Sequence, residues 1–430
     1  MQFTSTRGGQ PRVAFHEALQ QGLASDGGLF VPAEWPADAI PDLPAAAPLA
    51  DVAARFLEPF ARGDVLAAEL AVICAEAFDF PAPLVEVDSG LSVLELFHGP
   101  TAAFKDFGAR FLAAALTRLR RGAAKPLRIL VATSGDTGGA VAAAFHRRAG
   151  IEVVVLFPKG LVSPTQERQL TCWDGNVQSL AVRGTFDDCQ RMVKEAFLDQ
   201  SLRSRCELSS ANSINLGRLL PQAVYYVAAS RQVVARHGVK ASFVIPSGNL
   251  GNATACIWAR RLGAPIGEVL LAHNANRAVP DYLEQGVYRP RPSVATLASA
   301  MDVGAPSNLE RLTALYPDAA SLKGALSAVS VDDAAIAARI RADHLRYGRI
   351  WCPHTATAAE AYARLPEARR RAQQWVLVST AHPAKFREIV EPLVGISIAV
   401  PENLARLFER PSRCIEIEPT LAALSATFGV

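Results

Sequence analysis

From residue 127 onward, short apolar runs rich in β-branched residues alternate with longer stretches whose apolar residues recur at helical spacing. The runs predict buried strands at 127–133, 152–157, 177–182, 242–246, 268–273 and 375–379. The longer stretches predict amphipathic helices at 138–148, 186–198, 218–236 and 332–347. Nearly continuous apolar strands are buried on both faces, which is typical of parallel sheets covered by helices on both sides. The pattern therefore predicts an α/β fold with open, parallel-type sheets.

The two ends of the chain differ from this alternating region. Residues 1–85 have helical patterns at 12–21, 51–58 and 65–78, and they end at the segment Phe80-Pro81-Ala82-Pro83. Proline lacks a backbone N–H and restricts the residue before it, so this segment interrupts regular structure. We expect a helical N-terminal domain at 1–85, a core at 86–390 and a short helical tail at 391–430.

Composition excludes several classes of function. The 430 residues hold 44 Lys and Arg against 41 Asp and Glu, which gives a net charge of +3 and no electrostatic basis for binding nucleic acid or a membrane surface. No apolar segment reaches the ~18 residues that span a bilayer, and the first residues do not resemble a signal peptide. The seven cysteines contain no CxxC pair and the eight histidines no HExxH motif, so we expect no metal site and no disulfide framework. A cytoplasmic enzyme is the expectation.

Two glycine-rich loops follow predicted strands and lead into helices. The first is Thr133-Ser134-Gly135-Asp136-Thr137-Gly138, and the second is Ser247-Gly248-Asn249-Leu250-Gly251. Free N–H groups at a helix start carry the positive end of its dipole, and nearby hydroxyls add donors. Either loop alone could be a capped tight turn. Two of them in one chain indicate a site that holds anions such as a carboxylate and a phosphate.

Lys105 lies in an otherwise apolar segment, between Phe104 and Asp106 and close to a His98-Gly99-Pro100-Thr101 turn. A lysine partly desolvated among aromatic rings has a lowered pKa, and a free amine can form a Schiff base. The ordinary alternative is a lysine that extends along a helix into solvent. The neighbouring turn weakens that alternative for Lys105.

Two further segments carry polar groups at positions where chemistry is expected. Asn212, Ser213 and Arg218 combine an amide, a hydroxyl and a guanidinium that could bind phosphate. Thr380 directly follows the strand predicted at 375–379, and His382 lies two residues further on. Read alone, Arg218 could be a surface residue behind a helix cap, and His382 is more often a structural turn residue than a catalyst.

Taken together and in this order, these motifs resemble those of the threonine synthases of the bacterial and yeast type. The matching segments are 98–107, 133–138, 210–218, 246–251 and 380–386, together with the N-terminal segments 5–8 and 21–30. The resemblance covers nearly the whole chain. It implies the fold of type II pyridoxal-phosphate enzymes, similar to the tryptophan synthase β chain, with a smaller domain inserted at about 110–210.

The resemblance also implies a role for each motif. Lys105 would be the catalytic Schiff-base lysine, with Ser247, Gly248, Asn249, Leu250 and Gly251 around the cofactor phosphate and Thr380 at the pyridine nitrogen. Thr133, Ser134, Gly135 and Thr137 would hold the substrate carboxylate, and Asn212, Ser213 and Arg218 the substrate phosphate. Two positions depart from the common pattern. Leu250 stands where the family usually has Phe, and Asp136, expected near the cofactor, stands where many fold type II relatives have Asn, although Asp suits this subgroup.

The implied reaction converts O-phospho-L-homoserine and water into L-threonine and phosphate, with pyridoxal 5'-phosphate as cofactor. One alternative within the same cofactor class is a phospho-lyase that releases 2-oxobutyrate, ammonia and phosphate. A dinucleotide-dependent oxidoreductase would lack its GxGxxG motif and would leave Lys105 without a role. A non-catalytic cofactor carrier would not need the Arg218 group. The sequence leaves the oligomeric state open between monomer and homodimer.

Overall fold

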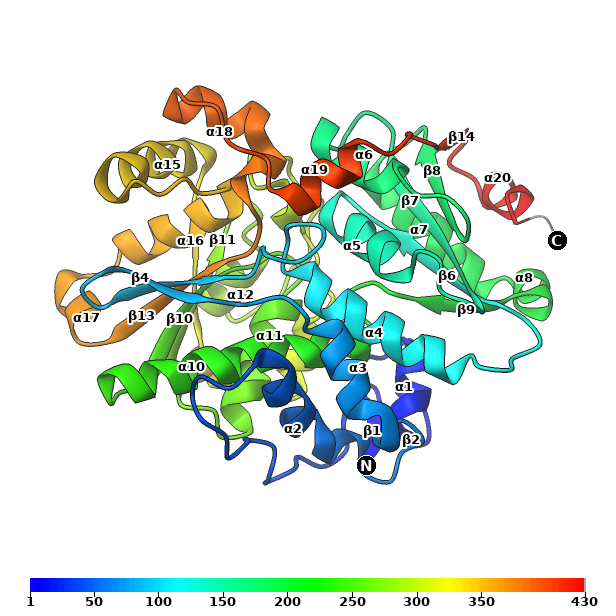
Figure 1. Cartoon of the computed structure of the whole chain (residues 1–430), viewed down its shortest axis with the longest axis horizontal. Helices are drawn as coiled ribbons and strands as arrows, with labels where there is room; N and C mark the ends of the chain where they lie inside the picture. Colours follow the sequence, from blue (N-terminus) through cyan, green and yellow to red (C-terminus); the bar gives the residue numbers. More distant parts are fainter. Residues whose placement is uncertain (429–430) are drawn as a thin grey trace.

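The apolar runs of the sequence form two separate open sheets in the computed structural model, which describes residues 1–428 (Figure 1). The larger sheet has the order β12-β11-β10-β13-β5-β4, and the smaller has the order β14-β8-β7-β6-β9. All neighbouring strands in both sheets are parallel except β4 and β5. The strands are β1 (Gln2–Ser5), β2 (Val13–Ala14), β3 (Phe30–Pro32), β4 (Leu84–Asp88), β5 (Leu91–Glu95), β6 (Leu127–Ala132), β7 (Ile151–Pro158), β8 (Val177–Val182), β9 (Glu207–Ser210), β10 (Ala241–Pro246), β11 (Ile266–His273), β12 (Ser327–Ser330), β13 (Gln374–Ser379) and β14 (Ile415–Ile417).

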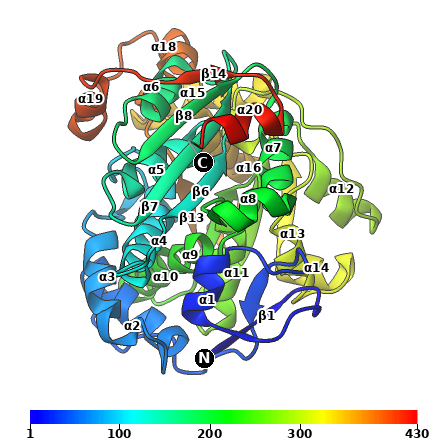
Figure 2. The same cartoon turned by 90° about the vertical axis from the view of Figure 1, so that its right-hand side faces the viewer.

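Helices cover both sheets and fill the region between them (Figures 1 and 2). The α-helices are α1 (Phe15–Gln21), α2 (Leu49–Ala61), α3 (Leu70–Ala77), α4 (Lys105–Leu119), α5 (Asp136–Phe145), α6 (Pro164–Thr171), α7 (Phe186–Leu198), α8 (Gln200–Arg205), α9 (Leu216–Leu219), α10 (Ala223–His237), α11 (Gly251–Arg261), α12 (Ala278–Gln285), α13 (Leu309–Thr313), α14 (Ala319–Ala325), α15 (Asp333–Tyr347), α16 (Pro353–Ala363), α17 (Glu367–Arg371), α18 (Arg387–Val394), α19 (Glu402–Phe408) and α20 (Leu421–Ala426). Among the residues described, no helix is both long and apolar enough to cross a membrane.

The prediction of two open, mainly parallel sheets with flanking helices is confirmed, and each predicted strand is present within a few residues. The apolar pattern missed β9 and β12, because each is a four-residue strand with two serines. It also missed β4 and β5, which form an antiparallel pair directly after the proline-rich segment. Strands β6 to β9 lie between residues 127 and 210. The boundaries of an inserted domain at about 110–210 stay a prediction.

Both ends of the chain contain strands that the helical patterns did not predict. Strands β2, β1 and β3 form a small antiparallel sheet within the first 32 residues, next to the expected helices. In the tail, β14 pairs with the edge strand β8 (Figure 2). These strands have two to four residues, too few for a period-two pattern to be recognised.

The N-terminal elements contact loops that belong to the rest of the chain. The Asn215 side chain donates to the Leu19 carbonyl oxygen at 3.0 Å, and the Ser209 hydroxyl donates to the Gln20 carbonyl oxygen at 2.7 Å. The Arg311 guanidinium donates to the Phe30 carbonyl oxygen at 3.1 Å. These bonds attach α1 to β9 and to the loop that follows it, and β3 to α13.

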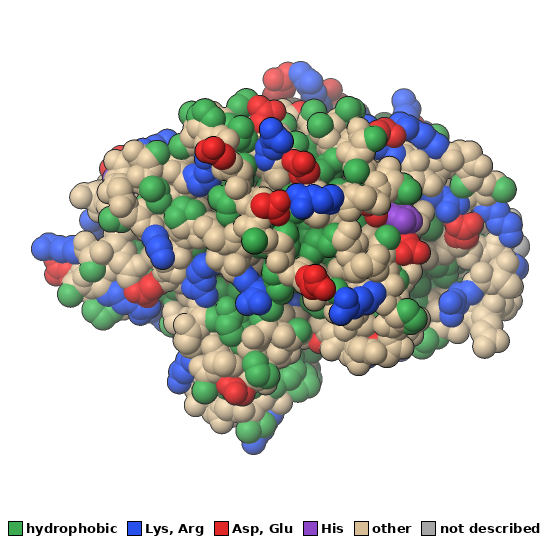
Figure 3. All heavy atoms as spheres, turned by 90° about the horizontal axis from the view of Figure 1, so that it is seen from below, with side chains coloured by type: hydrophobic (Ala, Val, Ile, Leu, Met, Phe, Trp, Pro, Cys, Tyr) green, Lys and Arg blue, Asp and Glu red, His purple; other side chains and the backbone are tan. Residues whose placement is uncertain are grey.

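Charged side chains on the face seen in Figure 3 are mixed, with acidic and basic groups interspersed among apolar ones. The loops that leave the carboxyl ends of β5, β6, β9, β10 and β13 enter the region between the two sheets. In open α/β sheets, ligands bind outside the carboxyl ends of the strands. The fold therefore places the candidate motifs at the same edge.

Candidate active site

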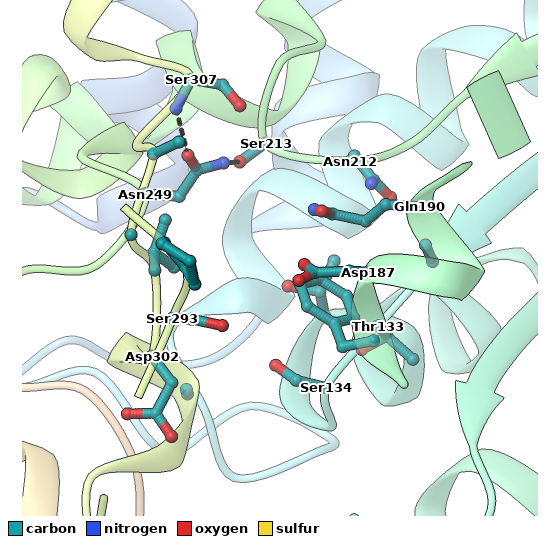
Figure 4. A pocket seen from close by; sticks show the side chains of 18 of the residues that line it. Thr133, Ser134, Asp187, Gln190, Asn212, Ser213, Asn249, Ser293, Asp302 and Ser307 are labelled. Atoms are coloured by element: carbon teal, nitrogen blue, oxygen red, sulfur yellow. Dashed lines mark hydrogen bonds between the residues drawn. The ribbon is translucent and has the colours of Figure 1, made fainter. Parts of the chain in front are cut away.

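A cavity of about 160 Å³ lies among these loops (Figure 4). Residues from both halves of the chain form its wall: Lys105, Ala132, Thr133, Ser134, Thr137, Phe186, Asp187, Gln190, Asn212, Ser213, Asn249, Arg291, Pro292, Ser293, Ala300, Asp302, Val303, Gly304, Ala305 and Ser307. Seven of the candidates selected from the sequence are among them: Lys105, Thr133, Ser134, Thr137, Asn212, Ser213 and Asn249. Four separate sequence segments thus meet at one cavity.

Lys105 is the first residue of α4, and its ammonium group lies 4.7 Å from the centre of the Phe104 ring. Burial lowers the pKa of Lys105 to about 8, and the positive charge of Arg218 acts in the same direction. A pKa this low leaves a useful fraction of free amine near neutral pH. The desolvated lysine expected from the sequence is therefore present at the wall of the cavity.

The turn before Lys105 is closed by a buried carboxylate. Asp106 accepts hydrogen bonds from the Thr101 backbone N–H at 2.8 Å and from the Thr101 hydroxyl at 2.7 Å. A Cβ atom at Gly99 would lie 2.5 Å from an Asp106 carboxylate oxygen, so only glycine fits there. Burial raises the pKa of Asp106 to about 6. This turn fixes the start of α4 and hence the position of Lys105.

The loop after β6 is held open by Thr133. Its hydroxyl oxygen accepts from the backbone N–H groups of Gly135 at 3.0 Å and of Gly138 at 2.9 Å. Gly135 has a φ of 142° and its Cβ position is occupied by Gln166, so no other residue fits. The hydroxyl of Ser134 points toward the cavity and makes no hydrogen bond with the residues described. Thr133 therefore shapes the loop, whereas Ser134 is available to a ligand.

The loop after β10 presents backbone donors at the start of α11. Within residues 1–428, the N–H groups of Gly248, Asn249, Leu250 and Gly251 have no hydrogen-bond acceptor. Leu250 adopts a left-handed conformation with a φ of 62° and ends the loop directly before the helix. Ser247 lies behind the loop, with its hydroxyl donating to the Ile245 carbonyl oxygen at 3.1 Å. The arrangement suits an anion at the helix start.

Asn249 connects this loop to the segment after β9 (Figure 4). Its side-chain N–H₂ donates to the Ser213 hydroxyl at 2.6 Å, and its oxygen accepts from the Ser307 N–H at 2.5 Å. Asn212 lies beside them, and its buried side-chain oxygen has no partner among the residues described. The group predicted to bind phosphate is thus physically joined to the second glycine-rich loop.

Arg218 lies behind the cavity and is not part of its wall. The side chain is 1% exposed and donates to the Ala211 carbonyl oxygen, while its Nε has no partner among the described residues. A Cβ atom at Gly108 would be 2.2 Å from the Arg218 carbonyl oxygen, which shows how closely α4 packs on α9. In this conformation Arg218 acts on the site through its charge beside Lys105.

The loop after β13 lies against the segment that carries Lys105. The Thr380 carbonyl oxygen accepts from the Phe104 N–H at 2.9 Å, and the His382 N–H donates to the Ala102 carbonyl oxygen at 3.0 Å. The Thr380 hydroxyl makes no hydrogen bond with other described residues. The His382 ring accepts from the Ala384 N–H at 3.2 Å and caps a short 3₁₀ helix, η4 (Pro383–Phe386). His382 is therefore a structural turn residue.

Sequence reasoning missed several residues of the site. Asp187 and Gln190 come from α7, whose amphipathic pattern explains them as a solvated helix face. Arg291 and Ser293 belong to a loop without a motif, where Arg291 pairs with Asp281 at 2.8 Å. Lys385 lies in the matching segment 380–386, but no local pattern assigns it a role. Its side chain is completely buried, which is unusual for a lysine and draws attention to it, but burial cannot be read from the sequence.

These residues fit pyridoxal phosphate, the cofactor that the sequence resemblance implies. The unpaired N–H groups at the start of α11 suit its phosphate, and the Thr380 hydroxyl, which has no partner among the described residues, suits its ring nitrogen. The amine of Lys105, with its lowered pKa, suits its aldehyde. Each donor that the cofactor needs is present, and none is occupied by another group of the described chain.

Three protein-family models match this chain, and together they cover nearly its whole length. The model of the pyridoxal-phosphate-dependent enzymes matches residues 80–381. Two further models, for the N terminus and the C-terminal part of threonine synthase, match residues 2–78 and 355–427. The model of the pyridoxal-phosphate-dependent enzymes covers more than half of the chain, and the three models together leave few residues unmatched.

Individual relatives give the same result. A threonine synthase of Haemophilus influenzae is 40% identical over 427 residues, which are 97% of each chain. The crystal structure of threonine synthase from Escherichia coli matches with a TM-score of 0.90 at 36% identity, covering 100% of this chain and 99% of the other. The threonine synthase structure from Brucella melitensis, described as bound to the cofactor, matches with a TM-score of 0.89 at 34% identity and covers 99% and 98%. The chain belongs to the threonine synthase family of pyridoxal-phosphate-dependent enzymes.

Proposed function

We propose that this chain converts O-phospho-L-homoserine and water into L-threonine and phosphate, with Lys105 as the residue that binds the cofactor and moves protons. One observation carries the proposal. The amine of Lys105, whose pKa is lowered to about 8, lies at the same cavity as the loop of Ser134 after β6 and the separate loop of Asn212 and Ser213 after β9. A substrate with a carboxylate at one end and a phosphate at the other needs both loops and an amine between them.

The cofactor, when bound, accepts the electrons released as protons leave the substrate carbons. Gly248, Asn249, Leu250 and Gly251 would hold its phosphate through the free N–H groups at the start of α11, with Ser247 behind them, where its N–H donates to the Ala272 carbonyl oxygen at 2.9 Å. The Thr380 hydroxyl would face its ring nitrogen. A hydroxyl there, unlike a carboxylate, does not hold that nitrogen protonated.

Lys105 acts as the general base in this scheme. Once the substrate amine has taken its place, the freed Lys105 amine removes a proton from the α-carbon. The same amine is placed to serve the neighbouring carbons in turn as phosphate leaves and water adds at the β-carbon. Because burial lowers its pKa, the amine can accept and release a proton near neutral pH.

The two ends of the substrate are held by different halves of the chain. Ser134 and Thr137, with the free N–H groups at the start of α5, would bind the carboxylate, and Thr133 keeps that loop and its Gly135 in shape. Asn212 and Ser213, fixed through Asn249, would bind the substrate phosphate. The charge of Arg218 behind them supports the departure of an anion.

We place the enzyme in the cytoplasm. Six of its seven cysteines are buried free thiols, which suits a reducing compartment.

The reaction is tested by incubating the purified chain with pyridoxal phosphate and O-phospho-L-homoserine in deuterated water and following both products by NMR. We expect equal amounts of phosphate and threonine, with deuterium at the α- and γ-carbons, because the proton removed at the α-carbon is replaced from solvent and the γ-carbon takes a proton from solvent after phosphate has left. Phosphate with 2-oxobutyrate and ammonia would instead indicate a lyase on the same site. No release of phosphate would contradict the assigned substrate.

Thr133 and Ser134 provide a matched pair of substitutions. Ser134→Ala removes a hydroxyl that has no partner among the described residues, so we expect kcat/KM to fall about 10- to 100-fold with an unchanged thermal midpoint. Thr133→Val leaves two buried N–H groups without an acceptor, so we expect a loss of about 1–3 kcal/mol in unfolding free energy. Steady-state kinetics and thermal unfolding separate the two effects. Equal effects on stability would show that Ser134 is also structural.

Lys105→Met tests the pKa of the amine through protein stability. The ordinary lysine pKa of 10.5 applies to the unfolded chain, whereas the folded pKa is about 8. The unfolded chain therefore binds more protons between pH 8 and 10.5, and the charged amine destabilises the fold most below pH 8. We expect the variant without cofactor to gain about 1–3 kcal/mol at pH 7 and to lose this advantage as pH rises toward 10.5.

The exposed Lys240 provides the control for this titration. Lys240→Met should change stability by less than about 0.5 kcal/mol at every pH. If Lys105→Met showed the same flat profile, the lowered pKa of Lys105 would be refuted.

A further inference from the structure

Lys385 forms a buried ion pair with Asp136 at the base of the site. The Lys385 side chain is completely buried, the Asp136 side chain is 5% exposed, and the Nζ–Oδ1 distance is 2.7 Å. Lys385 also donates to the Thr101 carbonyl oxygen at 2.9 Å, and Asp136 also accepts from the Gln166 side chain at 3.2 Å. Neither charged group is left without a partner.

This pair joins three of the segments that build the site. Asp136 starts α5 and lies in the loop after β6, Lys385 lies in η4 after β13, and Thr101 lies in the turn that precedes Lys105. The remaining contact of this network also converges there, because the Gln169 side chain donates to the same Thr101 oxygen at 3.0 Å. The ammonium of Lys385 therefore links the loop of Asp136 to the turn that precedes α4.

Stability alone does not explain a buried ion pair. Removing two charges from water costs much of what their attraction returns, so an apolar pair of similar size would serve the fold equally well. Burial by itself raises the pKa of Asp136, but the charge of Lys385, joined by that of the nearby His354 when its ring is protonated at low pH, outweighs it and lowers the pKa to about 2. The pair thus keeps a full negative charge inside the site.

The charges that face Lys105 come from three elements. Arg218 on α9 and Lys385 on η4 lower its pKa, whereas Asp136 on α5 raises it. Without Asp136, the charges of Arg218 and Lys385 would lower the pKa of Lys105 with no opposing effect from that carboxylate. Without Lys385, the carboxylate would face Lys105 with less compensation. The ion pair therefore sets the balance of charge at the amine.

We propose that Lys385 is a positioning residue for the reaction, which holds the ionised Asp136 against the Lys105 segment and so fixes both the loop of Asp136 and the charge around the Lys105 amine. The inference rests on the proposed role of Lys105. It also gives a reason for the departure at position 136, where a carboxylate is acceptable beside the site because a buried ammonium accompanies it.

Three other titratable groups lie close to the pair. The His354 ring accepts from the Ala300 N–H at 3.0 Å, and burial lowers the pKa of His354 to about 4, so the ring is neutral at neutral pH. Asp106, which Lys385 also influences, has a pKa raised to about 6 by burial. Burial likewise lowers the pKa of His382 to about 4. None of these three groups changes its charge above pH 7, so they do not interfere with a titration of Lys105 at higher pH.

The test measures the pKa of Lys105 in the full-length chain without cofactor. Each lysine is labelled with a trace of acetic anhydride between pH 7 and 11, and the extent of labelling is read by peptide mass spectrometry, with the other lysines as internal references. We expect Asp136→Asn to lower the pKa of Lys105 and Lys385→Met to raise it, each by about one pH unit. Lys385→Arg should retain the pKa of the unchanged chain.

The double variant Asp136→Asn/Lys385→Met removes both buried charges and is expected to fold even if a single variant does not, with a Lys105 pKa between those of the single variants. Lys159→Met, which removes a lysine paired with Glu416 at the surface, should leave Lys105 unchanged. Shifts in the same direction in both single variants, or no shift in either, would overturn the proposal. Because the titration needs neither substrate nor turnover, it stands or falls independently of the reaction assigned to the enzyme.

Discussion

An amine that has to bind a cofactor and exchange protons near neutral pH needs a pKa well below the ordinary lysine value. The structure meets this constraint by placing Lys105 at the first position of α4, against the Phe104 ring and near the buried Arg218. Its surroundings are then fixed by the turn that Asp106 closes and by the ion pair of Asp136 and Lys385. A lysine in a mobile or solvent-exposed segment would keep its ordinary pKa.

The rest of the fold serves to bring other groups to this amine. Two open sheets direct the carboxyl ends of their strands toward one another, so the loops after β6, β9, β10 and β13 reach it from different sides. The loop after β9 is bonded to α1 through Asn215, and Arg311 joins β3 to the Ile214 carbonyl oxygen at 2.6 Å. The N-terminal elements thus brace the segment that carries Asn212 and Ser213, although they contribute no side chain to the cavity wall.

Much of this arrangement could be predicted from the sequence, because the signals are local. Apolar runs indicated the buried strands, and glycines next to hydroxyl residues indicated loops that approach a ligand. The sequence could not distinguish roles within a loop. Thr133 and Ser134 are adjacent and chemically similar, yet the first hydroxyl binds the loop itself and the second is free for a ligand. Which one faces the cavity depends on the backbone path.

Contacts between segments far apart in the chain could not be predicted from the sequence either. Nothing local to Lys385 indicates a partner at Asp136, about two hundred and fifty positions earlier (385 − 136 = 249). The position of Arg218 was likewise not predictable from its motif, which suggests contact with phosphate, because the side chain lies behind the cavity wall; its role at the phosphate stays a prediction. Short strands such as β9 and β14 were missed because tertiary pairing, and not local pattern, makes them strands.

The most direct measurement is to identify which lysine carries the cofactor. The chain loaded with pyridoxal phosphate is reduced with borohydride, digested and mapped by mass spectrometry. The seven lysines include two that the structure places within the site, Lys105 and Lys385. We predict that the cofactor mass is found on Lys105 alone. Its attachment to Lys385, or to any other lysine, would contradict the central role of the Lys105 amine.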